Sequence, residues 1–417
     1  MISRKLLVTV FLFAFFKSYS QVDTSQHIVA GRVNSKEQQK KPYLVLISAD
    51  GFRYDYDEKF NADFLLNIKK QGVHAKSMQP SFPSLTFPNH YTLVTGLYPA
   101  HSGIPGNVFF DKKRKEVYNM GDKDVVKDGS WYKGTPLWVL AEEQKMLSAS
   151  LFWVGSEAAI KGILPTYYYS FNENMGIDQR IAAVVNWLKL PEEKRPHIIT
   201  FYLPEVDHAG HDFGPDADQT KRAVLFVDSA LAKLSKDVKA LGLPVSFVFL
   251  ADHGMIKIDS AVQTPPSDST KYRVSGSGSM AEVRLSDSSL LESTYQTLSG
   301  NSKGYKVIKS TETLSYWHYS KSEDWYGRIA DILLIPDSSY VFGSRNFKPR
   351  GYHGFDPLKV KEMHAYFSAW GPAFKSNITI PTFENVNVYP MIAKILGLKI
   401  TERIDGNETV LDPILVK

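Results

Sequence analysis

The sequence contains no cysteine among its 417 residues. That absence excludes disulfide bonds, cysteine-ligated zinc fingers, thiol nucleophiles and an amino-terminal lipoprotein anchor. Basic residues also form no runs interleaved with aromatics, although the formal net charge is +5. We therefore expect no sequence-specific nucleic-acid binding. Any metal ion would be held by nitrogen, carboxylate and water ligands alone.

A long apolar run occurs at the amino terminus, where Leu6 to Phe16 follow Arg4 and Lys5. Lys17 ends this run, which is too short to span a bilayer comfortably, and the small or polar residues up to Ser20 follow. Residues 1–20 therefore predict a secretory signal peptide, with an uncleaved membrane anchor as the alternative. We expect an exported protein, periplasmic or secreted, with no integral membrane span after the signal is removed.

The remaining chain has the composition of a large folded domain, since 43% of all residues are hydrophobic and 13% are aromatic. A polar leader occupies residues 21–41, and strand-like and helix-like segments alternate after it. The spacing of apolar residues predicts helices at Asn61 to Gln71, Asp178 to Leu190, Thr220 to Leu241, Ser289 to Leu298 and Val388 to Leu396.

This alternation predicts an α/β fold with a mostly parallel central sheet and helices on both faces. Two stretches interrupt it, at about 107–136 and 259–344, and both are expected as insertions over the active-site crevice. We therefore expect residues 42–417 to form a single catalytic domain, and the protein to be a monomer.

Three apolar runs are each followed within a few residues by an aspartate. They are YLVLIS ahead of Asp50, HIITFYL ahead of Asp207 and VSFVFLA ahead of Asp252. Each run is typical of a strand buried on both faces. Because loops at the carboxyl ends of neighbouring parallel strands converge on one crevice, these remote acids are predicted to share a site.

Histidines accompany two of these acids. Asp207 and His211 are four residues apart, which lets one helical turn direct both at one ion, and His253 directly follows Asp252. His353 lies between two glycines, Gly351 and Gly354, far down the chain. Taken singly, each residue also fits an ordinary structural role, such as a helix cap for Asp50 or a surface histidine for His211. Together they predict a dinuclear metal centre.

Thr86 is the candidate nucleophile. It stands two residues before Pro88, and proline favours the first turn of a helix, so Thr86 is predicted at a helix amino terminus. Exposed N–H groups and the helix dipole favour a phosphate group there. An ordinary helix-capping threonine is the alternative.

Several motifs, in order, resemble those of the ectonucleotide pyrophosphatase/phosphodiesterase family, which belongs to the alkaline phosphatase superfamily. They run from about Tyr43 to about Phe374 and are ADGFR, SFPSLTFPNHYTLVTGLYPAHSGIPGN, GTPLWVLAEE, LFWVGSEAAIKGILPTYY, VDHAGHDFGP, LADHGM and GYHGFD. The resemblance implies an alkaline phosphatase-like fold. It also implies two zinc ions, for which another divalent metal could substitute in some preparations.

The resemblance assigns two sets of metal ligands in this chain. The first ion matches Asp207, His211 and His353, and the second matches Asp50, Asp252, His253 and the nucleophile Thr86. Asn107 matches the asparagine that steadies a non-bridging phosphate oxygen. Phe87 and Tyr168 match the aromatic pair that sandwiches a nucleobase, with Tyr167 and Tyr169 as neighbours that a small shift would exchange. Lys127 is a weaker substrate-binding candidate.

The implied activity is hydrolysis of phosphodiester or pyrophosphate bonds in nucleotides and related diesters, with release of nucleoside monophosphates through a covalent phosphothreonine. One alternative is a phosphodiesterase for choline-headed lysophospholipids, because an aromatic pocket also binds a quaternary ammonium. Another is a phosphomonoesterase, for which Lys161 is the candidate extra cation. A non-catalytic nucleotide-binding protein is the alternative from a different class.

Overall fold

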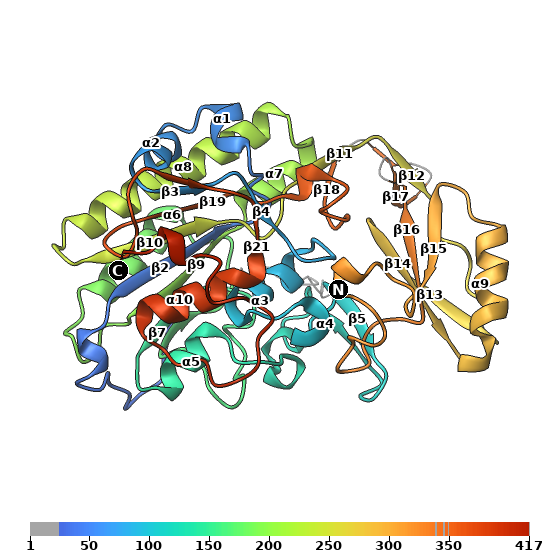
Figure 1. Ribbon diagram of the computed structural model, residues 1–417, viewed down its shortest axis with the longest axis horizontal. Helices are drawn as coiled ribbons and strands as arrows, with labels where there is room; N and C mark the ends of the chain where they lie inside the picture. The colour runs from blue at the N-terminus through green and yellow to red at the C-terminus, as the bar shows by residue number, and fades with distance from the viewer. Residues whose placement is uncertain (1–24, 338–339, 345–346, 349, 417) are drawn as a thin grey trace, which may run out of the picture.

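The computed structural model describes residues 25–337, 340–344, 347–348 and 350–416, so the predicted signal peptide lies outside the described residues. A nine-stranded sheet, in the order β1-β8-β7-β9-β2-β10-β19-β3-β20, forms the centre of the molecule (Figure 1). Its strands are β1 (Gln26–Ile28), β2 (Tyr43–Ala49), β3 (Val73–Ala75), β7 (Ser148–Leu151), β8 (Tyr167–Tyr169), β9 (Ile198–Leu203), β10 (Val245–Leu250), β19 (Phe367–Trp370) and β20 (Ile378–Ile380).

The sheet is mostly parallel, as predicted. Neighbouring strands from β8 through β7, β9 and β2 to β10 all pair in parallel. Every residue of β2 and β10 is buried, which explains the nearly continuous apolar runs in these segments. Two reversed strands were not predicted: β19 pairs antiparallel with both β10 and β3, and β1, from the polar leader, pairs antiparallel with β8.

Helices cover both faces of this sheet (Figure 1). One face carries α1 (Tyr56–Phe60), α2 (Asp63–Gln71), α6 (Ile177–Leu188), α7 (Glu205–Phe213) and α8 (Asp218–Lys239), and the other carries α3 (Thr86–Thr95), α4 (Pro99–Ser102), α5 (Leu137–Glu143) and α10 (Val388–Leu396). The helices predicted from apolar spacing are present within a few residues of their expected ends. Within the described part of the chain, no helix has the length and apolarity needed to cross a bilayer.

A smaller sheet lies to one side of the main body, at the right of Figure 1. Its strands, in spatial order, are β13 (Tyr272–Ser277), β14 (Met280–Leu285), β16 (Ile332–Pro336) and β15 (Tyr305–Lys309), and α9 (Leu291–Gly300) covers it. Short ladders link it to the body, pairing β11 (Ile256–Ile258) with β18 (Arg350–Tyr352) and β12 (Ser260–Val262) with β17 (Tyr340–Phe342). This sheet falls within the stretch 259–344.

The other irregular stretch, 107–136, contains a hairpin of β5 (Val108–Asp111) and β6 (Glu116–Asn119). A single buried side chain, Arg328, joins this hairpin region to the segment that leads into β16. Its Nε donates to Asp111 Oδ2 at 2.9 Å, and its Nη1 donates to the carbonyl oxygens of Trp131, at 2.6 Å, and Gly103. With 2% of its surface exposed, Arg328 holds together two segments more than 200 positions apart.

Replacing Arg328 with methionine should therefore destabilise the protein by about 3–5 kcal/mol, because Asp111 would be left buried without its cation. Equilibrium denaturation in urea, followed by tryptophan fluorescence, would measure this loss. The control is Lys394→Met, which breaks the exposed Lys394–Asp412 pair and should cost about 1 kcal/mol or less. Equal losses in the two variants would contradict the assigned role of Arg328.

Candidate active site and metal centre

The structure brings together the three acids that follow the apolar runs. Asp50 follows β2, Asp252 lies just beyond β10 and Asp207 lies in the first turn of α7 after β9, and β9, β2 and β10 are neighbours in the sheet. Gly51, with φ of +67°, lets the chain turn here, and a Cβ on it would meet Asp207 at 3.1 Å. The Gly51 N–H donates to Asp252 Oδ1 at 3.2 Å.

One group of possible metal-ligand atoms lies around Asp207. His211 Nε2 and His353 Nε2 lie 3.5 and 3.8 Å from Asp207 Oδ1. The same two Nε2 atoms lie 3.1 Å from each other. His353 reaches the group from just beyond β18, 142 residues after His211.

Hydrogen bonds fix the orientation of both imidazoles. His211 Nδ1 donates to the Gly351 carbonyl at 3.0 Å, and His353 Nδ1 donates to the Ser84 carbonyl at 2.9 Å. Because carbonyl oxygens only accept, each Nδ1 carries a proton, and in the neutral ring each Nε2 then presents a lone pair. Two such lone pairs facing each other across 3.1 Å repel unless a cation lies between them. Backbone carbonyls orient metal-binding histidines in this way.

A second group of possible metal-ligand atoms lies around His253, which is fully buried. Its Nδ1 donates to the Gly254 carbonyl at 2.9 Å, and its Nε2 faces Asp252 Oδ2 at 3.0 Å and Asp50 Oδ1 at 3.4 Å. Gly254 itself is required by close packing, because a Cβ there would lie 2.0 Å from the Glu362 carbonyl oxygen.

Three carboxylate oxygens in these groups lack a hydrogen-bond donor among the described residues, although all three are buried: Asp50 Oδ1, Asp207 Oδ1 and Asp252 Oδ2. Two sets, Asp207–His253–His353 and Asp50–Asp252–His253, each have ligand atoms within 4.8 Å of one another. Unpaired buried oxygens are costly, and divalent cations would satisfy them. Nitrogen and carboxylate donors at this spacing fit zinc.

The electrostatics also reflect close packing of these groups. Burial, together with the negative charges of Asp252 and Asp207, raises the pKa of Asp50 well above its ordinary value. Burial and the neighbouring His253 and His211 lower the pKa of His353 well below its ordinary value, which keeps it neutral. A neutral imidazole is the form that binds metal.

Thr86 lies beside the second group. It is the first residue of α3, as predicted, and its Oγ1 lies 3.2 Å from His253 Nε2. The hydroxyl is half-buried at the positive end of a ten-residue helix. Asn107 lies at the same helix end, where its Oδ1 accepts from the Phe87 N–H at 2.9 Å. This bond directs the opposite, NH₂ end of the amide away from the helix.

Two aromatic residues near this site were missed from the sequence. The Tyr202 hydroxyl donates to Asp50 Oδ2 at 2.6 Å, and the ring of Phe171 contacts the ring of Tyr202 at 6.1 Å. Phe171 is 46% exposed. The neighbouring run of tyrosines concealed it, since Phe171 follows Tyr167 to Tyr169 after one intervening serine.

The structure does not bring Tyr168 into this group of aromatics. Tyr168 lies on β8, and its ring stacks on His27 of β1 with 4.7 Å between ring centroids. Tyr167 donates its hydroxyl to the Lys194 carbonyl, and Tyr169 donates its hydroxyl to Gln26. Pairing with β1, which the sequence did not indicate, explains why these tyrosines are engaged at the sheet edge.

The two lysine candidates differ in their surroundings. Lys127 is half-exposed, and its Nζ lies 3.9 Å from Glu157, whose other oxygen accepts from the Phe171 N–H at 2.7 Å. Lys127 therefore lies on the Phe171 side of the site. Lys161 instead donates to Glu402 and to Thr135, both at 2.6 Å.

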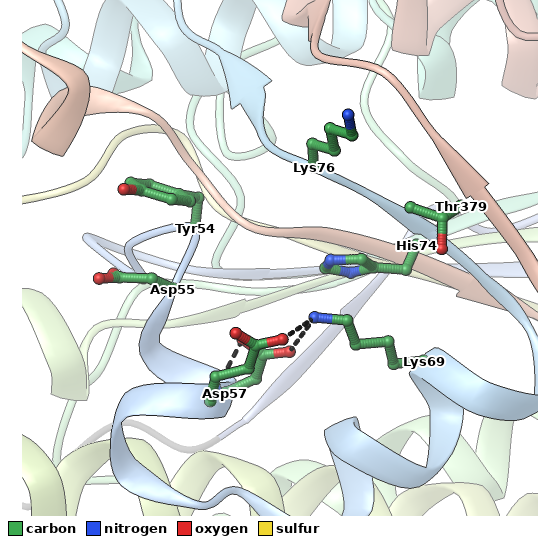
Figure 2. A pocket seen from close by; sticks show the side chains of 8 residues that line it. Tyr54, Asp55, Asp57, Lys69, His74, Lys76 and Thr379 are labelled. Carbon is green, nitrogen blue, oxygen red and sulfur yellow. Dashed lines mark hydrogen bonds and ion pairs between the residues drawn. The ribbon is translucent and has the colours of Figure 1, made fainter.

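A separate pocket of about 240 Å³ lies near β3 and contains none of the predicted site residues (Figure 2). Lys69 forms ion pairs there with Asp57 and Glu58, and His74 and Lys76 line the same pocket. Its charged groups largely neutralise one another, which distinguishes it from the unpaired donor atoms around His253.

Comparison with known proteins gives consistent matches over most of the chain. A pyrophosphatase/phosphodiesterase of Schizosaccharomyces pombe, described as uncharacterized, is 33% identical over 401 residues, which cover 89% of this chain and 80% of that protein. Mouse ectonucleotide pyrophosphatase/phosphodiesterase family member 1 is 32% identical and covers 91% of this chain, whereas the chain spans only 43% of that longer protein.

Comparison with solved structures finds the same family. Murine ectonucleotide pyrophosphatase/phosphodiesterase 5 superposes with a TM-score of 0.82 at 27% identity, covering 90% of this chain and all of that one. An inactive threonine-to-alanine variant of the same murine protein, in complex with AMP, superposes with a TM-score of 0.83. The family model for type I phosphodiesterase / nucleotide pyrophosphatase matches residues 44–356. The chain therefore belongs to the type I phosphodiesterase/nucleotide pyrophosphatase family, a family of enzymes within the alkaline phosphatase superfamily.

Proposed function

We propose that this protein is a zinc-dependent phosphodiesterase that hydrolyses phosphodiester or pyrophosphate bonds in nucleotides and releases nucleoside monophosphates. The observation that carries this proposal is the position of Thr86 Oγ1, 3.2 Å from His253, beside two sets of buried ligand atoms. The AMP complex of the murine relative supports a nucleotide substrate. The amino-terminal sequence supports export to the periplasm or beyond the cell, and we propose that residues 42–417 act as one catalytic domain in a monomer.

The two proposed zinc sites divide the ligands into sets. Asp207, His211 and His353 would hold one ion, and Asp50, Asp252 and His253 would hold the other beside Thr86. When bound, two divalent cations supply positive charge that lowers the pKa of a hydroxyl and neutralises a leaving oxygen. Threonine needs such activation because its hydroxyl is a poor nucleophile at neutral pH.

In the proposed reaction, Thr86 Oγ1 loses its proton and forms a bond to phosphorus while the bond from phosphorus to the leaving group breaks. The product is a covalent phosphothreonine diester. Water then attacks phosphorus, the bond to Thr86 Oγ1 breaks, and the hydroxyl regains a proton. The Asn107 NH₂ group donates to a non-bridging phosphate oxygen, since the Phe87 N–H already holds the amide oxygen.

Substrate binding is proposed to use the aromatic side of the site. Phe87, next to the nucleophile, and the exposed Phe171 offer ring faces for a nucleobase. Lys127 lies on the same side, because Glu157 contacts both Lys127 and the Phe171 N–H. The same surface suits a choline head group by cation–π attraction, so lysophospholipid diesters remain the second candidate. A phosphomonoesterase is disfavoured, because the ammonium group of Lys161 is already bonded to Glu402 and Thr135.

A substrate comparison tests the reaction class. We expect turnover of ATP and bis(p-nitrophenyl) phosphate to exceed that of p-nitrophenyl phosphate and p-nitrophenylphosphorylcholine, to vanish with a chelator and to return with zinc. Metal analysis of the same sample should find about two zinc ions per chain, as in a two-metal site. Preferred hydrolysis of the monoester, or diester turnover that survives chelation, would refute the proposal. Nucleotide binding without turnover by the zinc-loaded protein would indicate a binding protein instead.

Replacing Thr86 with alanine should reduce kcat by roughly a thousandfold or more while zinc content stays unchanged, because the nucleophile is lost and six ligands remain. Stopped assays with bis(p-nitrophenyl) phosphate would measure the rate. Thr86→Ser, which keeps the hydroxyl, serves as the control and should retain much of the activity. A near wild-type rate for the alanine variant would remove Thr86 from the mechanism.

Replacing Phe171 with alanine should raise KM for nucleotide substrates, because loss of a stacking surface costs about 1–3 kcal/mol, or roughly 5- to 150-fold. The matched variant is Tyr168→Ala, which removes the tyrosine that stacks on His27 and should leave KM unchanged. Steady-state kinetics with a dinucleotide would compare them. A larger effect for Tyr168 than for Phe171 would restore the assignment made from the sequence.

A further inference from the structure

His90 is a buried histidine that the proposed reaction does not use. It lies on α3 one turn after Thr86, and none of its surface is exposed. Its Nδ1 lies 3.0 Å from the Thr86 carbonyl oxygen and 3.3 Å from Asp252 Oδ2, and its Nε2 lies 2.8 Å from Ser48 Oγ. One ring thus contacts the nucleophile's own peptide unit, a proposed zinc ligand and the central strand β2.

These partners define the tautomer of the ring. The Thr86 carbonyl only accepts hydrogen bonds, so Nδ1 carries a proton and donates it there, and the same N–H group lies 3.3 Å from Asp252 Oδ2. Nε2 is then an acceptor, and the Ser48 hydroxyl donates to it. Burial alone would raise the pKa of Asp252, but His253 and His90 hold it well below its ordinary value.

Neighbouring aromatic groups keep the ring in this orientation. The rings of Trp153 and Tyr202 contact the imidazole edge-on at 5.2 and 5.1 Å, and Trp153 Nε1 donates to the His90 carbonyl at 3.1 Å. The order Ser48–His90–Asp252 resembles a hydrolytic relay in composition. Ser48 has no exposed surface, however, so it cannot reach a substrate.

We propose that His90 is a positioning residue that fixes the distance between the nucleophile helix and the zinc ligand Asp252. Its Nδ1–H donates to the first turn of α3 and lies 3.3 Å from the Asp252 carboxylate, so the polar N–H group attracts Asp252 while it holds the helix that carries Thr86. This inference rests on the proposed function, because it requires Asp252 to bind zinc. It adds a residue that acts through two others without contacting the substrate.

Two substitutions of His90 test the roles of its two ring nitrogens separately. The amide nitrogen of His90→Asn lies where Nδ1 was, so it can still donate to the Thr86 carbonyl and remain beside Asp252, whereas that of His90→Gln lies where Nε2 was. We expect the glutamine variant to lose about 10- to 100-fold in zinc affinity and in kcat, with KM little changed. The asparagine variant should recover most of both losses. Zinc affinity would be measured on metal-free protein with chelator-buffered zinc, independently of turnover.

His197→Gln is the matched control. His197 is equally buried, its Nδ1 donates to the Pro42 carbonyl at 3.1 Å, and it lies at the amino end of β9, at the opposite end of the strands from the site. Its replacement should lower the melting temperature but leave zinc affinity and kcat unchanged. A general packing defect would instead affect the His90 and His197 variants alike, which would overturn the inference.

The inference is also overturned if His90→Gln binds zinc and turns over like the wild type, or if His90→Asn is as defective as His90→Gln. Should the glutamine variant fail to fold, Ser48→Ala decides, because it removes the donor that fixes the tautomer. A severalfold loss of zinc affinity in Ser48→Ala supports the inference, and no change overturns it. Failure of wild-type protein to bind zinc would refute the proposed function itself.

Discussion

The architecture of the site depends on the concentration of unpaired acceptor atoms in a buried volume. Lone pairs of His211 and His353 face each other across 3.1 Å, and buried oxygens of Asp50, Asp207 and Asp252 lack donors among the described residues. Such a cluster opposes folding, because buried polar groups without partners and like charges at short range both cost free energy. The rest of the molecule must hold these atoms in place until cations satisfy them.

Rigid elements provide that support. The acids follow three neighbouring strands, two of which are buried along their whole length, and the histidines are oriented by the backbone carbonyls of Ser84, Gly254 and Gly351. Gly351 belongs to β18, so the ladder with β11 directly after the Asp252–His253 turn also positions the first ligand set. Metal binding, nucleophile placement and the attachment of the smaller sheet are therefore structurally connected.

Much of the fold could be predicted from the sequence because its signals are local. Buried parallel strands favour nearly continuous apolar runs, and β2, β9 and β10 have them. The helix α10 was predicted with its observed ends, Val388 and Leu396. The reversed strands were not predictable in this way. β1 is three residues long and lies in a polar segment, and strand direction in β19 depends on pairing with β3 and β10.

The candidate site likewise has some features that the sequence determines and others that depend on the tertiary structure. Sequence alone determined which residue types follow each strand, the helix start at Thr86 and the family motifs, since these depend on neighbours within a few positions. Only the tertiary structure decided that His353 reaches Asp207, that His90 joins Thr86 to Asp252, and that Phe171 rather than Tyr168 contacts Tyr202. Side-chain direction at a strand edge is set by the partner strand, and β1 engages Tyr168 through His27. That pairing joins residues about 140 positions apart, so no local pattern encodes it.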